Sequence, residues 1–292
     1  MKHLIYTILP FLFFCMSMTA QNEIKLYPKE PKESNEIAVD ESFQRNDFVI
    51  NISKPRMYEY IVPKDSANGT AVLICPGGGY SGVSVIKEGL EIAKWFNSLG
   101  VSAFVLYYRM PNGHSTVPLK DAQMALNIIR KGAKKWNIDK SKIGIMGFSA
   151  GGHLASTVGT HFKSKAQRPA FMILGYPVVT MQKELTHMGS RNNLLGKSPA
   201  DELVTLYSNE LQVTKKTPPT FIFHAKDDKV VPIANSEQLF KSLQDNNVSS
   251  EFQMFEKGGH GFGMRVKDID SSNWPNLLRA WMATQKLLPL QK

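Results

Sequence analysis

The sequence predicts an α/β fold, in which a mostly parallel central sheet carries helices on both of its faces. Short apolar runs alternate with amphipathic segments from about residue 70 onward, and this alternation is typical of parallel sheets covered by helices. One apolar run ends in a turn, residues 147–151, with glycines on both sides of a serine. The chain has 292 residues, of which 42% are hydrophobic, so one large domain with an ample core is expected.

The first segment, residues 1–20, indicates a secretory signal peptide that is cleaved after Ala20. A basic residue, Lys2, precedes an apolar run over 4–15, and this order is typical of such leaders. The run is shorter than the ~20 residues of a membrane-spanning helix. Lipid attachment at Cys15 is the weaker alternative, because bulky residues precede that cysteine. We therefore expect an exported protein, periplasmic or extracellular, with no membrane span in the mature chain.

The next segment, residues 21–47, is polar and contains prolines, which predicts an extended lead-in on the surface. Two strands are expected after it, over 48–52 and 57–62, paired antiparallel at one edge of the sheet. The main domain is then expected to cover residues 48–292.

Six apolar runs are expected to be the remaining strands of the sheet, because each is short and apolar and is followed by a turn or a helix. They cover residues 70–75, 102–108, 142–146, 171–175, 220–224 and 251–255. Segments with one apolar face at helical spacing are expected as helices between and after these strands. They cover residues 89–98, 121–136, 237–243 and 274–287.

Residues 182–213 interrupt this alternation with helical, polar and glycine-containing pieces. We expect them to form a small cap near the functional site, because inserted segments of this kind shape substrate pockets.

The strand over 142–146, the Gly-x-Ser-x-Gly turn and the small-residue helix after it have the order of a nucleophile elbow in an α/β-hydrolase. The serine backbone is strained in such a turn, so its neighbours must lack bulk, and Gly147 and Gly151 supply that room. The order predicts Ser149 as a nucleophile at the carboxyl end of the sheet, where open α/β folds place their sites.

A serine nucleophile needs a base and an orienting carboxylate, and in this fold the acid follows the serine along the chain. Asp227 and Asp228 stand directly after the strand expected over 220–224. The two residues compete for the role of the acid. We favour Asp228, because turn chemistry usually engages the first acidic residue with the local backbone.

His260 is the preferred base, because it comes last in chain order and lies in a glycine-rich loop after the last strand. The glycines around it let the backbone reach into the site. His153, four residues after the nucleophile, and His224, at a strand end, are expected to be buried and hydrogen-bonded. His161 and His187 stand in no motif.

An oxyanion hole needs two backbone donors, and one of them is expected to be the N–H of Ala150, the residue after the nucleophile. The other is expected from the glycine-rich loop over 75–80, and each donor contributes about 3 kcal/mol to the transition state. A phosphate-binding loop is the alternative, but the Walker lysine and the GxGxxG spacing are missing. Tyr80 either lines the acyl or alcohol pocket or packs in the core.

The formal charge is +10, but the lysines are dispersed, and no nucleic-acid motif accompanies them. A solvated basic surface is the preferred interpretation, with weak attraction to an acidic glycan as the alternative. No HExxH or CxxC pattern is present, so no metal and no cofactor are expected. After loss of Cys15, Cys75 is alone, which excludes an intrachain disulfide.

Together these motifs resemble the exported α/β-hydrolases related to bacterial acetylxylan esterases and to esterases of the BD-FAE and hormone-sensitive-lipase types. The resemblance spans about residues 27–281. It is carried by residues 76–80, 108–109, 121–122, 147–155, 228–232 and 260–263. The departure from the family is Pro76, where many such esterases carry a histidine.

The resemblance implies three catalytic residues, Ser149, Asp228 and His260. It also implies that Gly78 or Gly79 forms the oxyanion hole with the residue after the nucleophile. The same likeness suggests that the protein acts on carbohydrate esters.

We expect a secreted serine carboxylesterase that removes acetyl groups from xylan-type plant polysaccharide or its oligosaccharides. The alternatives are a feruloyl or other carboxylesterase and a peptidase of the prolyl-oligopeptidase type, which usually carries a further large domain. A non-catalytic carbohydrate-binding protein would be favoured by a missing member of the triad, and every member is present.

Overall fold

A computed structural model describes residues 22–31, 33–44, 47–266 and 270–289. The expected signal peptide and Cys15 lie outside these residues. The centre of the fold is an eight-stranded sheet with the strand order β1-β4-β7-β5-β8-β9-β10-β11. The strands are β1 (Glu23–Lys25), β4 (Arg56–Tyr60), β5 (Ala71–Cys75), β7 (Ser102–Tyr107), β8 (Ile143–Phe148), β9 (Met172–Gly175), β10 (Thr220–Ala225) and β11 (Ser250–Phe255).

All neighbours from β7 to β11 in this order pair in parallel, and only β4 and β1 run antiparallel to the strands beside them. The prediction of a mostly parallel sheet is therefore confirmed. Each of the five crossovers between parallel strands of this sheet contains a helix, because parallel neighbours need a long connection.

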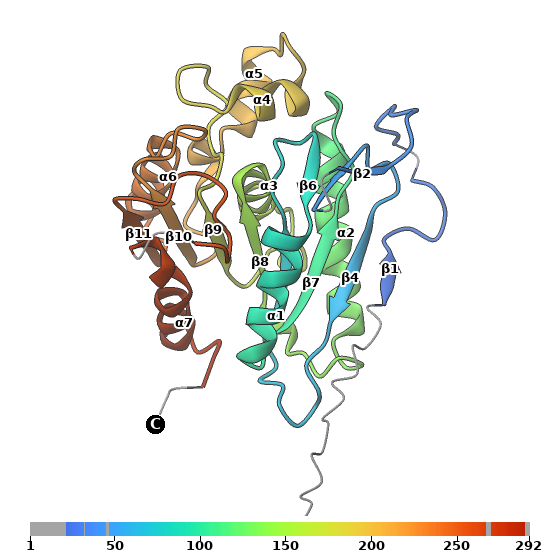
Figure 1. The fold of residues 1–292 in the computed structure, drawn as a ribbon, viewed down its shortest axis with the longest axis vertical. Coiled ribbons are helices and arrows are strands. Elements are labelled where there is room, and N and C mark those ends of the chain that lie inside the picture. The colour runs from blue at the N-terminus through green and yellow to red at the C-terminus, as the bar shows by residue number, and fades with distance from the viewer. Residues whose placement is uncertain (1–21, 32, 45–46, 267–269, 290–292) are drawn as a thin grey trace, which may run out of the picture.

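Helices cover both faces of the sheet (Figure 1). One face carries α1 (Glu91–Ser98) and α7 (Trp274–Thr284), which touch through the rings of Trp95 and Trp274 at 5.7 Å. The other face carries α2 (Thr116–Gly132), α3 (Ser149–Thr160) and α6 (Ala234–Asp245). Because both faces are covered, the central strands are apolar along their whole length.

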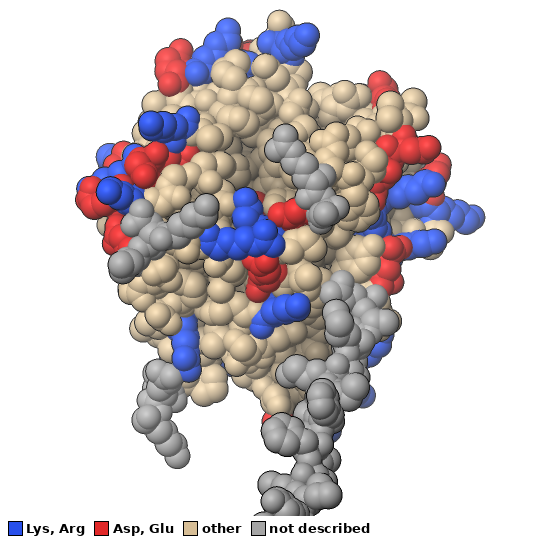
Figure 2. Space-filling model, in the orientation of Figure 1, with Lys and Arg blue, Asp and Glu red and all other residues tan. Residues whose placement is uncertain are grey.

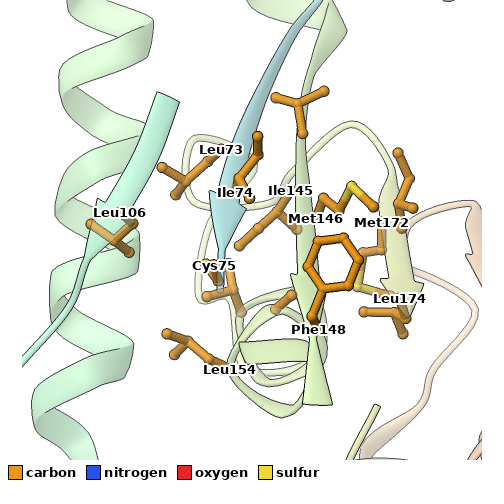
Figure 3. Close-up of a cluster of buried hydrophobic side chains, with 14 of the residues drawn as sticks. Leu73, Ile74, Cys75, Leu106, Ile145, Met146, Phe148, Leu154, Met172 and Leu174 are labelled. Atoms are coloured by element: carbon orange, nitrogen blue, oxygen red, sulfur yellow. The ribbon is translucent and has the colours of Figure 1, made fainter. Parts of the chain in front are cut away.

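Figure 3 shows the core where β5, β8 and β9 lie side by side. Leu73, Ile145 and Leu174 are fully buried there. Each such side chain contributes roughly 1.5–3 kcal/mol by leaving water. This rigid centre carries the segments that form the functional site at the carboxyl ends of its strands.

The strand expected over 48–52 is placed differently in the structure, and its expected pairing at the edge of the main sheet is wrong. Here β3 (Phe48–Ile50) pairs antiparallel with β2 (Ser42–Gln44) and β6 (Gly82–Ser84) in a separate small sheet. Asn51 has a φ of 58°, a left-handed conformation that turns the chain between β3 and β4. The edge of the main sheet is instead taken by β1, from the lead-in.

The long helix expected over 121–136 begins and ends earlier, as α2 (Thr116–Gly132). Pro118 lies in its first turn, where the missing N–H of proline is not needed. At the other end, the helix stops at Gly132 and the chain continues as a turn, in which the N–H of Ile138 bonds to the carbonyl of Ala133 at 2.8 Å.

The segment expected as a cap contains α4 (Met188–Leu195), α5 (Asp201–Tyr207) and a short 3-10 turn (Asn209–Gln212). Figure 1 shows α4 and α5 together at the top of the molecule, beyond the ends of the central strands. In the view of Figure 2, Lys and Arg side chains stand singly or beside acidic ones and form no continuous basic patch. Within the described ranges, no helix has the length and apolarity to cross a membrane.

Candidate active site

The turn between β8 and α3 holds Ser149 at its sharpest point. Ser149 is the first residue of α3 and has a φ of 51°, a strained conformation for a residue with a side chain. A Cβ atom on Gly147 would lie 2.1 Å from the carbonyl oxygen of Gly151, and one on Gly151 would lie 2.1 Å from that of Cys75. Both positions therefore require glycine, because strand, helix and neighbouring strand pack backbone to backbone.

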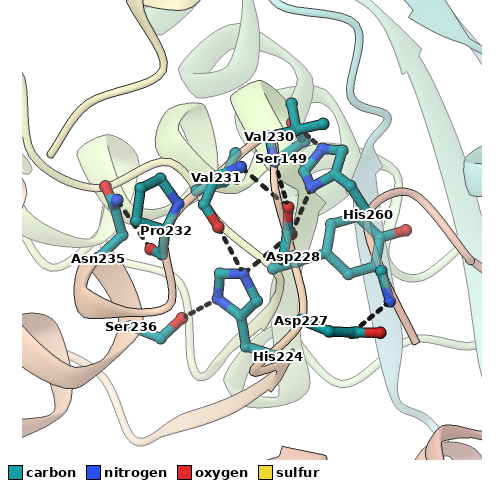
Figure 4. Close-up of polar contacts among 12 residues, drawn as sticks. Ser149, His224, Asp227, Asp228, Val230, Val231, Pro232, Asn235, Ser236 and His260 are labelled. Carbon is teal, nitrogen blue, oxygen red and sulfur yellow. Dashed lines mark hydrogen bonds and ion pairs between the residues drawn. The ribbon is translucent and has the colours of Figure 1, made fainter. Parts of the chain in front are cut away.

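His260 connects Ser149 to Asp228 (Figure 4). Its Nε2 atom lies 2.9 Å from Ser149 Oγ, and its Nδ1 atom lies 2.6 Å from Asp228 Oδ2. A carboxylate only accepts hydrogen bonds, so Nδ1 carries the proton and Nε2 accepts from the serine hydroxyl. The structure thus brings together the three side chains that the sequence singled out, from three separate segments.

Asp228 accepts hydrogen bonds on both of its oxygens. Its Oδ1 accepts from the N–H groups of Val230 and Val231 at 2.8 and 2.9 Å, and its Oδ2 accepts from His224 and His260. Burial by itself raises the pKa of this carboxyl, but the bonds from the two histidines outweigh it and hold the pKa well below its usual range. Asp228 is therefore ionised whenever His260 is active as a base.

The reason that favoured Asp228 over Asp227 in the sequence is wrong, although Asp228 is the residue beside the histidine. It is Asp228 that bonds the local backbone, at Val230 and Val231. Asp227 instead accepts the N–H of Gly259 at 2.7 Å. The first acid thus holds the histidine loop, and the second orients the histidine itself.

His224 is a second histidine on the same carboxylate, a role that the sequence did not indicate. Its Nε2–H lies 3.0 Å from Asp228 Oδ2 and 3.1 Å from the carbonyl of Val231, and its Nδ1 accepts from Ser236 Oγ at 2.8 Å. His224 is completely buried, as expected. The signal in the sequence is its spacing, because it precedes the acid by four residues across one strand end.

The glycine-rich loop after β5 presents free backbone donors. The N–H of Gly77 is not among them, because it donates to Glu88 Oε2 at 2.8 Å. The carbonyl of Gly77 accepts from the N–H of Ser84 at 2.9 Å. In a trans peptide the C=O and the following N–H point in opposite directions, so the N–H of Gly78 faces away from Ser84. Among the described residues, the N–H groups of Gly78 and Gly79 have no hydrogen-bond partner.

Ala150 supplies a third unpaired N–H, because the first turn of a helix has no intrahelical partners for its donors. It follows Ser149 at the start of α3. A Cβ on Gly77 would lie 2.9 Å from the Cβ of Ser149, so the loop and the helix start are in contact. Gly78 and Gly79 follow this contact in the chain and Ala150 follows Ser149, so their N–H groups are the candidate donors to an oxyanion.

Of the two alternatives left open for Tyr80, pocket or core, its burial favours the core; a substrate contact stays a prediction. Its side chain is 2% exposed, and its hydroxyl lies 2.9 Å from His153 Nδ1. His153 Nε2 in turn donates to the carbonyl of Tyr207 at 2.8 Å. Burial lowers the pKa of His153 to about 4, so His153 is the buried, hydrogen-bonded histidine that its position predicted.

The cap reaches the glycine-rich loop through α4. Asn193 Nδ2 donates to the carbonyl of Gly79 at 2.8 Å. His187, the N-cap of α4, accepts the N–H of Ser190 on Nδ1, which leaves its proton on Nε2. A Cβ on Gly79 would lie 3.6 Å from His187 Cε1. Burial lowers the pKa of His187, and the charge of His260 lowers it further against the effect of Asp228. His187 thus lies at the rim of the site, although no motif marked it.

Sequence comparison finds relatives over most of the chain. The profile of the BD-FAE family matches residues 59–243. An acetylxylan esterase of Xylanibacter ruminicola is 37% identical over 223 residues, which cover 74% of this chain and 46% of that protein. The endo-1,4-beta-xylanase B of Butyrivibrio fibrisolvens is 37% identical over 234 residues, which cover 75% of this chain and 36% of that protein. The chain spans less than half the length of these relatives.

Solved structures share the whole fold. The acetyl ester-xyloside bifunctional hydrolase of Caldicellulosiruptor lactoaceticus superposes with a TM-score of 0.79 at 35% identity, covering 91% of this chain and 97% of that one. The carboxylesterase Cest-2923 of Lactobacillus plantarum superposes with a TM-score of 0.69 at 22% identity, covering 86% of this chain and 99% of that one. The second likeness shows the fold alone.

Proposed function

The chain belongs to the BD-FAE family of α/β-hydrolases, and we propose that it is a serine carboxylesterase that removes acetyl groups from xylan-type polysaccharide or its oligosaccharides. The observation that carries this proposal is the bridge that His260 forms between Ser149 Oγ and Asp228 Oδ2. Such a bridge activates a serine hydroxyl for attack on an acyl carbon.

In the proposed reaction Ser149 Oγ attacks the ester carbonyl while His260 Nε2 takes its proton. Asp228 holds the imidazole tautomer and stabilises the imidazolium that forms. The negative oxygen of the tetrahedral intermediate accepts from the N–H of Ala150 and from Gly78 or Gly79. His260 then gives this proton to the departing sugar oxygen, which leaves as a hydroxyl. Water next loses a proton to His260 as it attacks the acyl carbon, and Ser149 Oγ takes that proton as acetate is released.

The acetylated sugar substrate is supported by the names of two relatives, an acetylxylan esterase and an acetyl ester-xyloside hydrolase. Both are at least 35% identical to this chain. A xylanase also matches, which fits a role in xylan breakdown. Export is part of the same proposal and depends on the leader pattern before Gln21.

The test is hydrolysis of p-nitrophenyl acetate, longer acyl esters and feruloyl esters, together with acetate release from acetylated xylan. We expect preference for acetate, release of acetate from xylan, and loss of activity in Ser149→Ala. Ser156→Ala is the matched control, because Ser156 lies in the same helix α3. Its hydroxyl bonds the carbonyl of His153 and the side chain of Asn209, and neither belongs to the proposed triad. Preference for feruloyl or long acyl groups would contradict the proposed acetyl substrate. Full activity of Ser149→Ala would refute the proposed mechanism.

A further inference from the structure

We propose that Glu88 is a positioning residue that acts with Tyr176 to fix the oxyanion loop and the His260 loop in place relative to each other. The proposal rests on the esterase function proposed above. The oxyanion loop is residues 76–80, and the His260 loop is residues 258–263.

Glu88 lies in a π-helical turn, Ile86–Leu90, that leads into α1. Turns of this kind occur often at functional sites. Its side chain is only 3% exposed, and its Oε2 atom accepts the N–H of Gly77 at 2.8 Å. The carbonyl on the other side of the same peptide unit, that of Pro76, accepts from Tyr108 at 2.8 Å. One peptide of the oxyanion loop is therefore held at both ends.

The second carboxylate oxygen serves the other loop. Glu88 Oε1 accepts from the hydroxyl of Tyr176 at 2.8 Å, and the same hydroxyl oxygen accepts the N–H of Gly263 at 3.0 Å. The ring of Tyr176 lies edge-on to the imidazole of His260, with centroids 5.0 Å apart. Tyr176 thus contacts the His260 loop at two points, the imidazole of His260 and the N–H of Gly263.

These contacts make one continuous chain of bonds from Gly77 through Glu88 and Tyr176 to Gly263. Each oxygen of Glu88 has one donor, and the two donors come from segments far apart in the sequence. A buried carboxylate costs free energy that an apolar side chain of similar volume does not. What the carboxylate provides is two fixed acceptors, one for each loop.

The orientation of the Gly77 peptide sets the direction of the Gly78 N–H, and the position of the His260 loop sets the approach of Nε2 to Ser149. Neither is expected to affect how the ground-state substrate rests in the pocket. Loss of the coupling should therefore lower kcat and leave KM nearly unchanged, because small misplacements of reacting groups act on the transition state.

The experiment compares Glu88→Gln, Tyr176→Phe and the double variant with wild type on p-nitrophenyl acetate. Glu210→Gln is the matched control, because Glu210 is also buried and bonds to neither loop. We expect kcat to fall roughly 10- to 100-fold in each single variant, with KM within about twofold. The double variant should be no slower than the slower single variant, since coupled residues are not additive.

A second readout separates positioning from simple destabilisation. A trifluoromethyl ketone forms a tetrahedral adduct with the nucleophilic serine, and its affinity should fall by the same factor as kcat. Folding is monitored by thermal unfolding, and Tyr176→Phe, which removes one atom, carries the test if Glu88→Gln does not fold.

The inference is overturned if Tyr176→Phe retains full kcat, if Glu88→Gln matches Glu210→Gln, or if the double variant shows the product of the single effects. Those outcomes leave the proposed function intact, provided that Ser149→Ala is inactive. A wild-type protein that hydrolyses no ester would instead refute the proposed function and this inference together.

Discussion

At the scale of single residues, the site depends on which of two adjacent carboxylates faces the histidine. Asp228 accepts from His260 at 2.6 Å, whereas Asp227 accepts from the backbone of Gly259 at 2.7 Å. We predict that Asp228→Asn lowers kcat by about 10⁴-fold, because the wrong imidazole tautomer then faces the serine. Asp227→Asn keeps an acceptor for Gly259 and is expected to cost less than about tenfold. Steady-state kinetics of both variants check this, and equal losses would contradict the assignment.

The buried histidine of α3 predicts a pH dependence of stability. Burial lowers the pKa of His153 to about 4, whereas the unfolded chain protonates histidine near ~6.5. Between these values the unfolded state binds more protons, so the free energy of unfolding falls as pH falls from about 6.5 to about 4. The loss from this residue is about 1.4 kcal/mol per pH unit at most.

His153→Gln removes this titration. We expect the free energy of unfolding of the variant, measured by urea denaturation, to vary less with pH between about 4 and 6.5 than that of the wild type. Parallel pH profiles for the two proteins would show that His153 is not the group responsible.

At the scale of elements, the cap contributes directly to the oxyanion loop. Asn193 in α4 donates to the carbonyl of Gly79 at 2.8 Å. We predict that Asn193→Ala lowers kcat by roughly tenfold, since one hydrogen bond contributes about 1 kcal/mol and the loop loses a fixed point. Asn192→Ala is the control, because Asn192 lies beside Asn193 in the same helix and its side chain has no described hydrogen bond to the loop. Equal activity of the two variants would show that this bond from the cap does not contribute to catalysis.

His187 is the N-cap of the same helix, and its Nδ1 is engaged by Ser190, which leaves Nε2–H as a donor. We expect this donor to bind a hydroxyl of the sugar. His187→Ala should then lower kcat/KM for acetylated xylo-oligosaccharides more than for p-nitrophenyl acetate, by up to about tenfold for one hydrogen bond. The ratio of the two substrates is the measurement. An unchanged ratio would limit His187 to capping α4 through Ser190.

At the scale of the whole molecule, the lead-in is bonded into the domain. Asn35 is 2% exposed, and its Nδ2 atom donates to the carbonyls of Ile52 and Met110 at 3.0 and 2.8 Å. Asn35→Ala is predicted to lower the free energy of unfolding by roughly 1–3 kcal/mol, because the carbonyl of Met110 loses its donor and the carbonyl of Ile52 keeps only the N–H of Met110. Activity at low temperature should be retained. Asn22→Ala, at an exposed bond to Glu59, is the control in the same thermal-unfolding assay.

Much of the fold and of the site follows from local patterns. The central strands are continuous apolar runs, because both faces of the sheet are covered. Ser149 lies between two glycines that the strand-to-helix turn requires. His260 follows the last strand in a glycine-rich loop. Each of these signals depends on neighbours along the chain, and a sequence displays such neighbours directly.

Other features depend on partners distant in the chain and could not be predicted. The strand over 48–50 joins β6 because a bend at Asn51 separates it from β4. The side chain of Tyr80 turns inward because His153 supplies a partner for its hydroxyl. Glu88 looks in the sequence like a polar residue before an amphipathic helix, and its two donors lie 11 and 88 residues away.

The amino-acid order was thus sufficient for the type of fold, the place of the nucleophile and the candidates for its base and acid. These are set by backbone sterics and by periodic burial, which act over a few residues. The three-dimensional packing was needed for the separate roles of Asp227 and Asp228, for the second histidine on the acid, and for Glu88 between the two loops. Hydrogen bonds act over about 3 Å in space and at any separation along the chain, so only the folded structure can assign them.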